Sequence, residues 1–225
     1  MKRHGISSLV KAAVGASFVA ALAAIPVAEA APLAVSSYSM NNGAHGSYNY
    51  RDFTYSNCAG LCDVTNAALS GGTGKLTDGV SPNLSWYQYG ENTPWVGWDF
   101  GQGQLDPTVT FKFNGTVNID SITVWVDNSL GAGGVWHPAS ISVDGDSFAL
   151  PLDSVDPSPR AYTFSNLDII GSSVTLQFFQ QPNWQWLMVG EVSFDGSAVP
   201  EPATLSLIGL ALVGFGVSRR RPSHS

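Results

Sequence analysis

The chain has 225 residues, of which only 12% are charged and 11% are aromatic, and it contains 24 glycines. This composition excludes a disordered chain and argues against a helical bundle; it favours one β-rich extracellular domain with many turns. Residues 31–197 carry four basic and fifteen acidic side chains, a net charge of −11, so nucleic acid is not expected as a partner.

Residues 1–30 have the three parts of a secretory signal. Residues 12–27 form a mostly small, apolar core, and Ala28-Glu29-Ala30 matches a cleavage site. The basic start consists of Lys2, Arg3 and Lys11. We therefore predict a helical signal peptide, export through the Sec pathway and a mature chain that begins at Ala31. An uncleaved membrane anchor is the alternative, and the short, alanine-rich core argues against it.

Two cysteines, Cys58 and Cys62, lie in the sequence CAGLC. Because the signal peptide places them in an oxidising compartment, we predict a local disulfide. A metal site would need more ligands than this loop offers, and a redox pair is usually spaced CxxC.

The first half of the domain contains several predicted strands. Leu33–Met40 and Tyr48–Tyr55 are expected near its start, and 95–100 is expected to enter the core. In 108–113, Val109, Phe111 and Phe113 alternate with polar residues. Asn114-Gly115 follows and predicts a hairpin turn.

Further strands are predicted toward the C-terminus. Residues 119–126 place Ile122, Val124 and Val126 on one face and Trp125 on the other. Asp144-Gly145 predicts a turn between strands at 140–143 and 147–150. Strands at 173–179 and 187–194 complete the set. No segment shows a sustained helical period, so the pattern favours a single antiparallel β-sandwich or jelly roll over 31–197.

Aromatic side chains are concentrated in or beside the predicted loops. Rings with nearby amides suit sugars, which present both apolar faces and hydroxyl groups. The candidate ligand-binding residues are Trp86, Tyr87, Tyr89, Trp136, His137, Trp184 and Trp186, with Trp95 nearby and with Gln88, Asn92, Asn183 and Gln185 as polar contacts. The alternative is that these rings only plug the ends of the sandwich.

The sequence offers no convincing catalytic group. His45 and His137 are the histidines of the domain, and neither belongs to a meaningful Ser-His-Asp spacing. The carboxylates at 144–156 are better interpreted as parts of solvated turns than as a glycosidase pair. We therefore expect no enzyme.

The C-terminal residues 198–225 form a separate segment. Pro200-Glu201-Pro202 precedes an apolar run at 203–217, and Arg219, Arg220 and Arg221 follow. The run is short for a membrane span, which needs about 20 residues. The three parts in this order resemble the PEP-CTERM sorting signal of Gram-negative bacteria. The resemblance implies a hydrophobic helix that anchors the chain transiently in the inner membrane, processing by an exosortase, and release or attachment at the cell surface in biofilm-forming bacteria.

Motifs within the domain resemble a second family. Lys75-Leu-Thr-Asp-Gly79, Trp95–Phe100, Ile119–Val126, Val143-Asp-Gly145 and Trp186–Gly196 occur in this order. The order is similar to that of discoidin, or coagulation-factor type C, domains among the galactose-binding-like jelly rolls. It implies an all-β antiparallel jelly-roll sandwich. The terminal cysteines of the animal domains are absent, so the resemblance is to the superfamily.

This second resemblance also implies a structural calcium ion. Asp78 lies in a run of turn residues, and Glu191 matches the glutamate of the last strand that closes the family's site. Carboxylates and backbone carbonyls are the ligands that Ca²⁺ takes. The alternative is that Asp78 caps a turn and Glu191 faces solvent.

Together these observations predict an exported, non-enzymatic surface or matrix protein that binds or organises extracellular polysaccharide. The alternative is a purely structural matrix protein without a specific glycan site. A membrane is expected as a partner only through the C-terminal segment, before processing.

Overall fold

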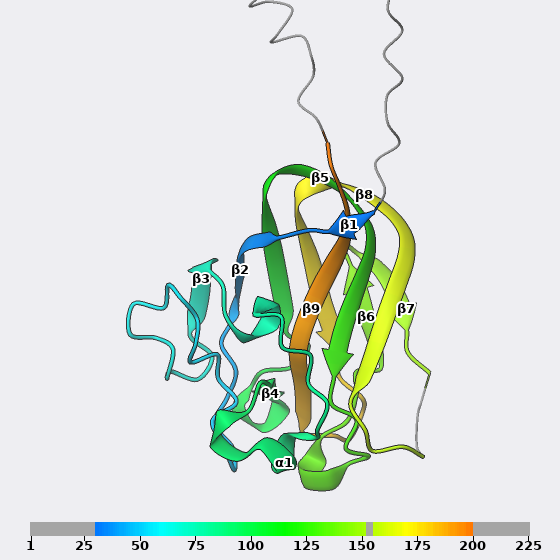
Figure 1. The fold of residues 1–225 in the computed structure, drawn as a ribbon. Coiled ribbons are helices and arrows are strands. Elements are labelled where there is room, and N and C mark those ends of the chain that lie inside the picture. The colour runs from blue at the N-terminus through cyan, green and yellow to red at the C-terminus, as the bar shows by residue number, and fades with distance from the viewer. Residues whose placement is uncertain (1–29, 152–154, 200–225) are drawn as a thin grey trace, which may run out of the picture.

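The structure is a computed structural model, which describes residues 30–151 and 155–199 (Figure 1). The predicted signal helix and the predicted C-terminal hydrophobic helix lie outside the described residues. Within those two ranges, no helix combines the length and the apolar character needed to cross a membrane.

Strands dominate the described part of the chain. The strands are β1 (Ala31–Pro32), β2 (Val35–Asn41), β3 (Ala68–Gly72), β4 (Val96–Asp99), β5 (Thr108–Val126), β6 (Ser140–Val143), β7 (Asp146–Ala149), β8 (Arg160–Phe179) and β9 (Trp186–Ala198). The helical elements are short: α1 (Trp86–Tyr89) and the 3-10 turns η1 (Lys75–Thr77), η2 (Gly90–Asn92), η3 (Phe100–Gln102) and η4 (Ala132–Gly134).

One layer of the sandwich is built around β9. On one side β9 pairs antiparallel with residues 117–126 of β5, and on the other side it pairs with β4 and β1. Residues 160–171 of β8 pair with the far side of β5. This layer therefore carries β4 at the end where β9 begins.

The other layer uses the opposite halves of the same long strands. Residues 109–113 of β5 pair with β2 on one side, and residues 108–112 pair with residues 173–177 of β8 on the other. β3 and β6–β7 extend the layer at its two edges. The two layers face one another (Figure 1). Rings meet across the core: Phe111 and Phe194 are 5.0 Å apart between centroids, and Trp98 stacks on Phe178 at 6.2 Å.

The predicted hairpin turn at Asn114-Gly115 is wrong. β5 continues through these residues, and its register against β8 shifts between Lys112 and Val117. Gly115 has a φ of 99°, which a glycine adopts at a bulge as readily as at a turn. Because β8 follows β5 on both sides of the shift, the pair bends from one layer into the other and does not reverse.

The predicted strand at Tyr48–Tyr55 is also wrong. These residues form bends and turns, with one isolated bridge between His45 and Asn49. Tyr50 and Tyr55 are nevertheless buried. The aromatic residues were buried as the pattern suggested, but the segment is held by side-chain hydrogen bonds and by single backbone bonds, such as that from the Gly97 amide to the Tyr50 carbonyl at 2.9 Å, and not by a strand ladder.

The other predicted strands are confirmed, and the all-β sandwich is confirmed with them. The apolar faces named from the sequence form the core, and all of their members are buried: Val109, Phe111, Phe113, Ile122, Val124 and Val126. The alternating apolar residues of the predicted strands 173–179 and 187–194 are buried with them: Val174, Leu176, Phe178, Val192 and Phe194. At the predicted β6–β7 turn, Asp144 and Gly145 both have positive φ, as a two-residue hairpin loop requires. Only residues 173–179 of β8, which spans Arg160–Phe179, were predicted as a strand, and no strand was predicted at β3.

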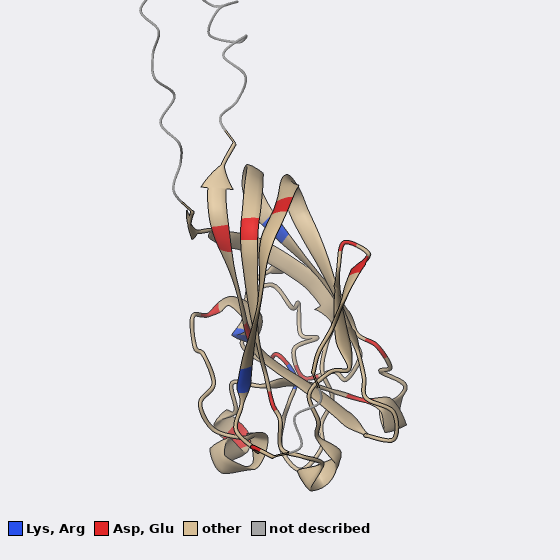
Figure 2. Ribbon diagram, turned by 90° about the vertical axis from the view of Figure 1, so that its right-hand side faces the viewer, with Lys and Arg blue, Asp and Glu red and all other residues tan. Residues whose placement is uncertain are grey.

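The two ends of the described domain lie together, at the opposite end from α1 and β4 (Figure 1). β1 pairs with β9 at Gly196, and the Val199 amide donates to the Thr116 carbonyl at the bend of β5. Charged side chains are sparse along the strands between the two ends (Figure 2).

Candidate functional site

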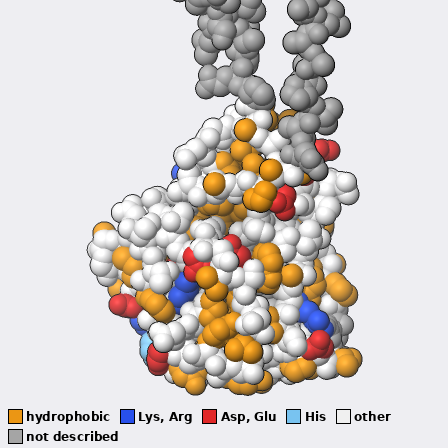
Figure 3. All heavy atoms as spheres, in the orientation of Figure 1, with side chains coloured by type: hydrophobic (Ala, Val, Ile, Leu, Met, Phe, Trp, Pro, Cys, Tyr) orange, Lys and Arg blue, Asp and Glu red, His pale blue; other side chains and the backbone are white. Residues whose placement is uncertain are grey.

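The loop end, where α1 and β4 lie, has an aromatic cluster separate from the main core. Tyr50, Trp95 and Trp186 are buried there with Ala44, Val135 and Met188, and Trp86 packs against them half-buried. Hydrophobic side chains gather over this end in the space-filling view (Figure 3). The rings come from three regions far apart in the sequence, around Tyr50, at 86–95 and at Trp186, so the fold concentrates them here.

Trp86 is positioned by its backbone and by its ring. Its amide donates to the buried carboxylate of Asp127 at 2.6 Å, and its indole Nε1 donates to the Ala132 carbonyl at 3.2 Å. The helix that it begins is closed by a capping box between Ser85 and Gln88. At Gly133, with a φ of 63°, a Cβ would lie 2.3 Å from the Trp86 ring, so the ring lies flat against bare backbone.

Burial raises the pKa of Asp127 to about 6, although the hydrogen bonds from Ser129 and Trp86 oppose that shift. The ionised form is therefore stabilised by the same contact that fixes Trp86.

A pocket of about 270 Å³ opens beside these rings. Its apolar wall is formed by Tyr50, Trp86 and Trp186, and its polar wall by Asp99, Gln102 and Gln185. The remaining lining comes from His45, Gly46, Ser47, Gly133, Val135 and Met188. Aromatic faces opposite a few convergent polar groups are the usual composition of a small-ligand site.

Asp99 is the acidic group of this pocket and is only 3% exposed. Its carboxylate accepts hydrogen bonds from the Gly101 amide at 2.7 Å, from Gln102 Nε2 at 2.8 Å and from Gln185 Nε2 at 3.3 Å. These three donors stabilise the negative charge and hold both glutamine side chains against the wall.

The hydroxyl of Tyr50 is buried without a hydrogen bond to any described residue. The backbone of Tyr48 is near it but does not meet hydrogen-bond geometry. Burial is the main reason that the pKa of this hydroxyl is raised. A buried polar group without a partner is uncommon in native proteins, and here it belongs to a side chain that lines the pocket.

Segment 43–52, which supplies His45, Ser47 and Tyr50, is fixed at both ends by Asn42. The Asn42 Oδ1 accepts from the Gly43 amide at 2.9 Å and from the Asp52 amide at 2.8 Å. Its Nδ2 donates to the Cys62 carbonyl at 2.8 Å, so the same side chain also holds the disulfide loop.

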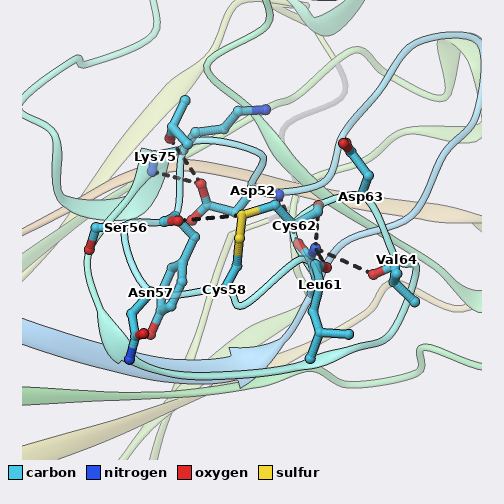
Figure 4. The surroundings of a disulfide bond; sticks show 12 residues. Asp52, Ser56, Asn57, Cys58, Leu61, Cys62, Asp63, Val64 and Lys75 are labelled. Carbon is cyan, nitrogen blue, oxygen red and sulfur yellow. Dashed lines mark hydrogen bonds between the residues drawn. A yellow bond between two sulfur atoms is a disulfide. The ribbon is translucent and has the colours of Figure 1, made fainter.

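The predicted disulfide joins Cys58 and Cys62 in the structure (Figure 4). Lys75 lies beside this region, where its amide donates to Asp52 at 3.1 Å. Its ammonium donates to the carbonyls of Arg51 at 2.8 Å and Trp95 at 3.3 Å, and burial lowers its pKa to about 8. This lysine anchors the turn that carries Asp78.

Trp136 and Trp184 form a second aromatic group outside the pocket lining. Their rings stack with centroids 4.6 Å apart, and both are partly exposed. Trp184 lies against Gly131, where a Cβ would be 2.3 Å from its ring.

The other predicted ligand-binding residues lie elsewhere. His137 is fully buried, with its Nδ1 2.7 Å from the Pro138 carbonyl, so the prediction that it contacts a ligand is corrected. Trp95 is fully buried in the aromatic cluster. Tyr89 bonds to Asn83 through its hydroxyl, and Tyr87 is 46% exposed with its ring edge-on to Trp86.

Of the predicted polar contacts, Gln185 lines the pocket, while Gln88 belongs to the capping box. Asn92 and Asn183 are exposed.

Sequence reasoning missed Tyr50, Asp99 and Gln102. Asp99 had a usable signal, because it is the one carboxylate within the otherwise apolar run Trp95–Phe100. Tyr50 was assigned to a strand, which hid its place in a loop. Nothing in the sequence around Gln102 suggested that it belongs to a site.

A larger groove of about 530 Å³ runs along β2, β3 and the start of β5. Its lining mixes serine, threonine and asparagine with apolar residues, and its one ring, Trp98, is 1% exposed. The smaller pocket has the half-buried ring of Trp86 and the unpartnered hydroxyl of Tyr50, and the groove has no comparable group, so we place the candidate site in the smaller pocket.

Asp78 and Glu191 do face one another. Glu191 is 6% exposed and accepts from the Gly79 amide at 3.2 Å, while Asp78 accepts from the Val80 amide at 2.9 Å. Burial, and then the neighbouring Asp78 charge, raise the pKa of Glu191 to about 8. Burial likewise raises the pKa of Asp78. The expectation that Glu191 could face solvent is thus excluded by its burial.

In the described part of the chain, no group of three or more His, Cys, Asp or Glu side chains could hold a metal ion. An ion at the carboxylate pair would therefore take its remaining ligands from backbone carbonyls and water.

Two family models match the chain. The model of the discoidin domain-containing receptor 1/2 DS-like domain matches residues 34–196, and the model of the PEP-CTERM protein-sorting motif matches residues 198–221. A search of curated proteins found no match.

Several solved structures are similar at low identity. A truncated AlyQ with CBM32 and alginate lyase domains is 8% identical with a TM-score of 0.41; the match covers 77% of this chain but only 35% of that one. A fucolectin from the serum of Morone saxatilis (striped bass) is 13% identical with a TM-score of 0.37, covering 75% and 80%. The Clostridium perfringens module CpGH89CBM32-4, in complex with GlcNAc-alpha-1,4-galactose, is 11% identical with a TM-score of 0.36, covering 75% and 97%.

Proposed function

We propose that this chain, which belongs to the family of discoidin domain-containing receptor 1/2 DS-like domains and carries a PEP-CTERM protein-sorting motif, is an exported, non-enzymatic protein that binds polysaccharide through its loop-end pocket. In this proposal it binds or organises extracellular polysaccharide in a biofilm, after processing by an exosortase. The observation that carries the proposal is the pocket wall of Tyr50, Trp86 and Trp186 opposite Asp99, Gln102 and Gln185.

The chemistry of that pocket suits a sugar ring. Pyranose rings present C–H groups that pack on aromatic faces, and hydroxyl groups that bond to amides and carboxylates. The volume of about 270 Å³ is just below the range of about 300–1,000 Å³ typical of drug-sized ligands, which fits one or two sugar units.

The position of the pocket supports a role at a surface. Trp186 begins β9 and lines the pocket, whereas the sorting motif starts where β9 ends. Thirteen residues of strand separate them by roughly 40 Å at about 3.3 Å per residue. A protein held at a cell surface by its C-terminal end would therefore present the pocket outward.

The test is binding of the purified protein to an array of bacterial polysaccharides, compared with two alanine variants. We expect Trp86→Ala to weaken binding at least tenfold, because it removes one wall of the pocket, and Trp184→Ala to change it less than threefold. The reverse pattern would place binding at the stacked Trp136–Trp184 pair. No retention of the wild type on any polysaccharide would favour the alternative, a structural matrix protein without a glycan site.

Calcium is a second part of the proposal. Asp78 and Glu191 would hold a structural ion beside η1. Burial disfavours the charged forms of both carboxylates, and the ion would neutralise that charge. The pair lies outside the lining of the loop-end pocket, so the ion would act on stability and not on ligand contact.

A further inference from the structure

We infer that the loop-end pocket prefers a cationic amino-sugar unit, one that carries a free ammonium group, over neutral and anionic sugars. The inference rests on the proposed function, since it names the class of glycan that the same pocket would take. It follows from three features of the pocket: its hydrogen-bond polarity, its charge and its aromatic walls.

Hydrogen-bond acceptors dominate the polar wall. The amide nitrogens of Gln102 and Gln185 both donate to the Asp99 carboxylate, so both Oε1 oxygens and one N–H of Gln185 are left for a ligand, and acceptors outnumber donors. Gln102 Nε2 also donates to the His45 carbonyl at 3.1 Å, which engages it further. An ammonium group has three donors and no acceptor, whereas a carboxylate has only acceptors. The wall thus complements an ammonium and opposes a uronate.

The negative charge of the polar wall also favours a cationic ligand over an anionic one. Asp99 is nearly buried, so its negative charge is less screened than one at the surface. No lysine or arginine is among the described residues that line the pocket. His45 is the basic side chain in the lining, and it lies exposed at the rim.

The apolar wall adds aromatic faces. Tyr50 is set at 82° to Trp86 and at 69° to Trp186, with ring centroids 6.1 Å and 5.3 Å apart. These are edge-to-face contacts, and the half-buried Trp86 is the ring of this wall with the most exposed surface. A cation held over such faces is attracted by their quadrupoles, and Trp gives the strongest attraction.

The test is calorimetric titration of the purified full chain, at about pH 6, with three short oligosaccharides of equal length. They are built from glucosamine, N-acetylglucosamine and galacturonate, which carry positive, neutral and negative charge. We expect the glucosamine oligomer to bind at least tenfold more tightly than the N-acetyl form, and the uronate at least tenfold more weakly than the N-acetyl form.

Matched variants separate the pocket from the net charge of the domain. Asp99→Asn should reduce the preference for glucosamine to less than threefold, because the side-chain amides of Gln102 and Gln185 can rotate to accept from the new amide. Asp146→Asn removes the same charge from an exposed position on β7 and should keep the full preference. Thermal melting of each variant checks that it is folded.

The outcomes separate the charge preference from the proposed binding of polysaccharide. Equal affinity for the three oligomers, or tighter binding of the uronate, would overturn the charge preference and leave the proposed function standing. An equal loss of preference in Asp99→Asn and Asp146→Asn would also overturn it, because net charge would then be the cause. If Asp99→Asn does not fold, the wild type and Asp146→Asn decide: a preference that disappears as sodium chloride rises, or that Asp146→Asn loses, contradicts the inference, because the nearly buried Asp99 is screened less than surface charge. Failure to bind any of these oligomers or any polysaccharide would reject the proposed function itself.

Discussion

Replacing Asn42 by alanine is expected to lower the free energy of unfolding by about 4 kcal/mol. Asn42 is fully buried, and its side chain links three parts of the chain. The substitution leaves the amides of Gly43 and Asp52 and the carbonyl of Cys62 without their partner, and each buried orphan costs about 1–3 kcal/mol. The effect should reach the pocket, because segment 43–52 is fixed by the same bonds.

Urea unfolding with the disulfide intact measures this effect. The matched control is Asn57→Ala, since Asn57 is exposed and its side chain donates one bond, to the Ser70 carbonyl at 3.2 Å. That variant should lose about 0.5 kcal/mol or less. Equal losses in the two variants would show that Asn42 does not hold the loop as described.

The second large effect concerns Glu191. Its pKa is raised from 4.5 to about 8 in the folded chain, so the folded state binds the proton more tightly than the unfolded state. The stability that this provides is complete below about pH 4.5 and is lost as pH rises through about 8. In a chelator, the wild type should therefore lose about 2 kcal/mol between pH 5 and pH 9, after allowance for partial solvation of the carboxyl group.

Glu191→Gln isolates this contribution. Burial also raises the pKa of Asp127, which titrates lower, and lowers that of Lys75, which acts in the opposite direction above pH 8. Both are present in the variant, so the difference between the two curves belongs to Glu191 and to its coupling with the neighbouring Asp78, whose pKa burial also raises. The variant should keep the loss due to Asp127, which ends near pH 6, and lack the further loss as pH rises through about 8.

Calcium should raise the melting temperature of the wild type at pH 8 and leave that of Glu191→Gln unchanged. Equal wild-type melting temperatures in calcium and in chelator would reject the structural ion. Parallel pH profiles for the two proteins would reject the raised pKa.

Much of the fold could be predicted because strand alternation reports burial directly. The alternating residues of both halves of β5 were assigned to the face that they occupy, and strands were predicted at β6, β7, the C-terminal half of β8 and β9. The bend at Gly115 could not be predicted, since a positive φ serves a turn and a bulge equally well and the choice depends on the distant strand β8. The loop segment around Tyr50 was misassigned for a related reason: its order comes from Asn42, a residue outside the segment.

The candidate site was predictable only in part. Trp86, Trp186 and Gln185 were identified because aromatic residues and amides in loops suggest sugar contact. His137 was named on the same grounds, but its ring turned inward. Which loop rings share a pocket depends on glycines such as Gly133, against whose backbone Trp86 lies, and that contact is set by tertiary structure.

The most direct test of the proposed site is the response of the seven tryptophan indole signals in a ¹⁵N NMR spectrum during titration with a bound oligosaccharide. If the loop-end pocket binds the sugar, the signals of Trp86 and Trp186 shift, while those of the buried Trp98 and of the stacked pair Trp136 and Trp184 stay in place. Saturable binding that moves only Trp136 and Trp184, or that leaves Trp86 unchanged, would contradict the account.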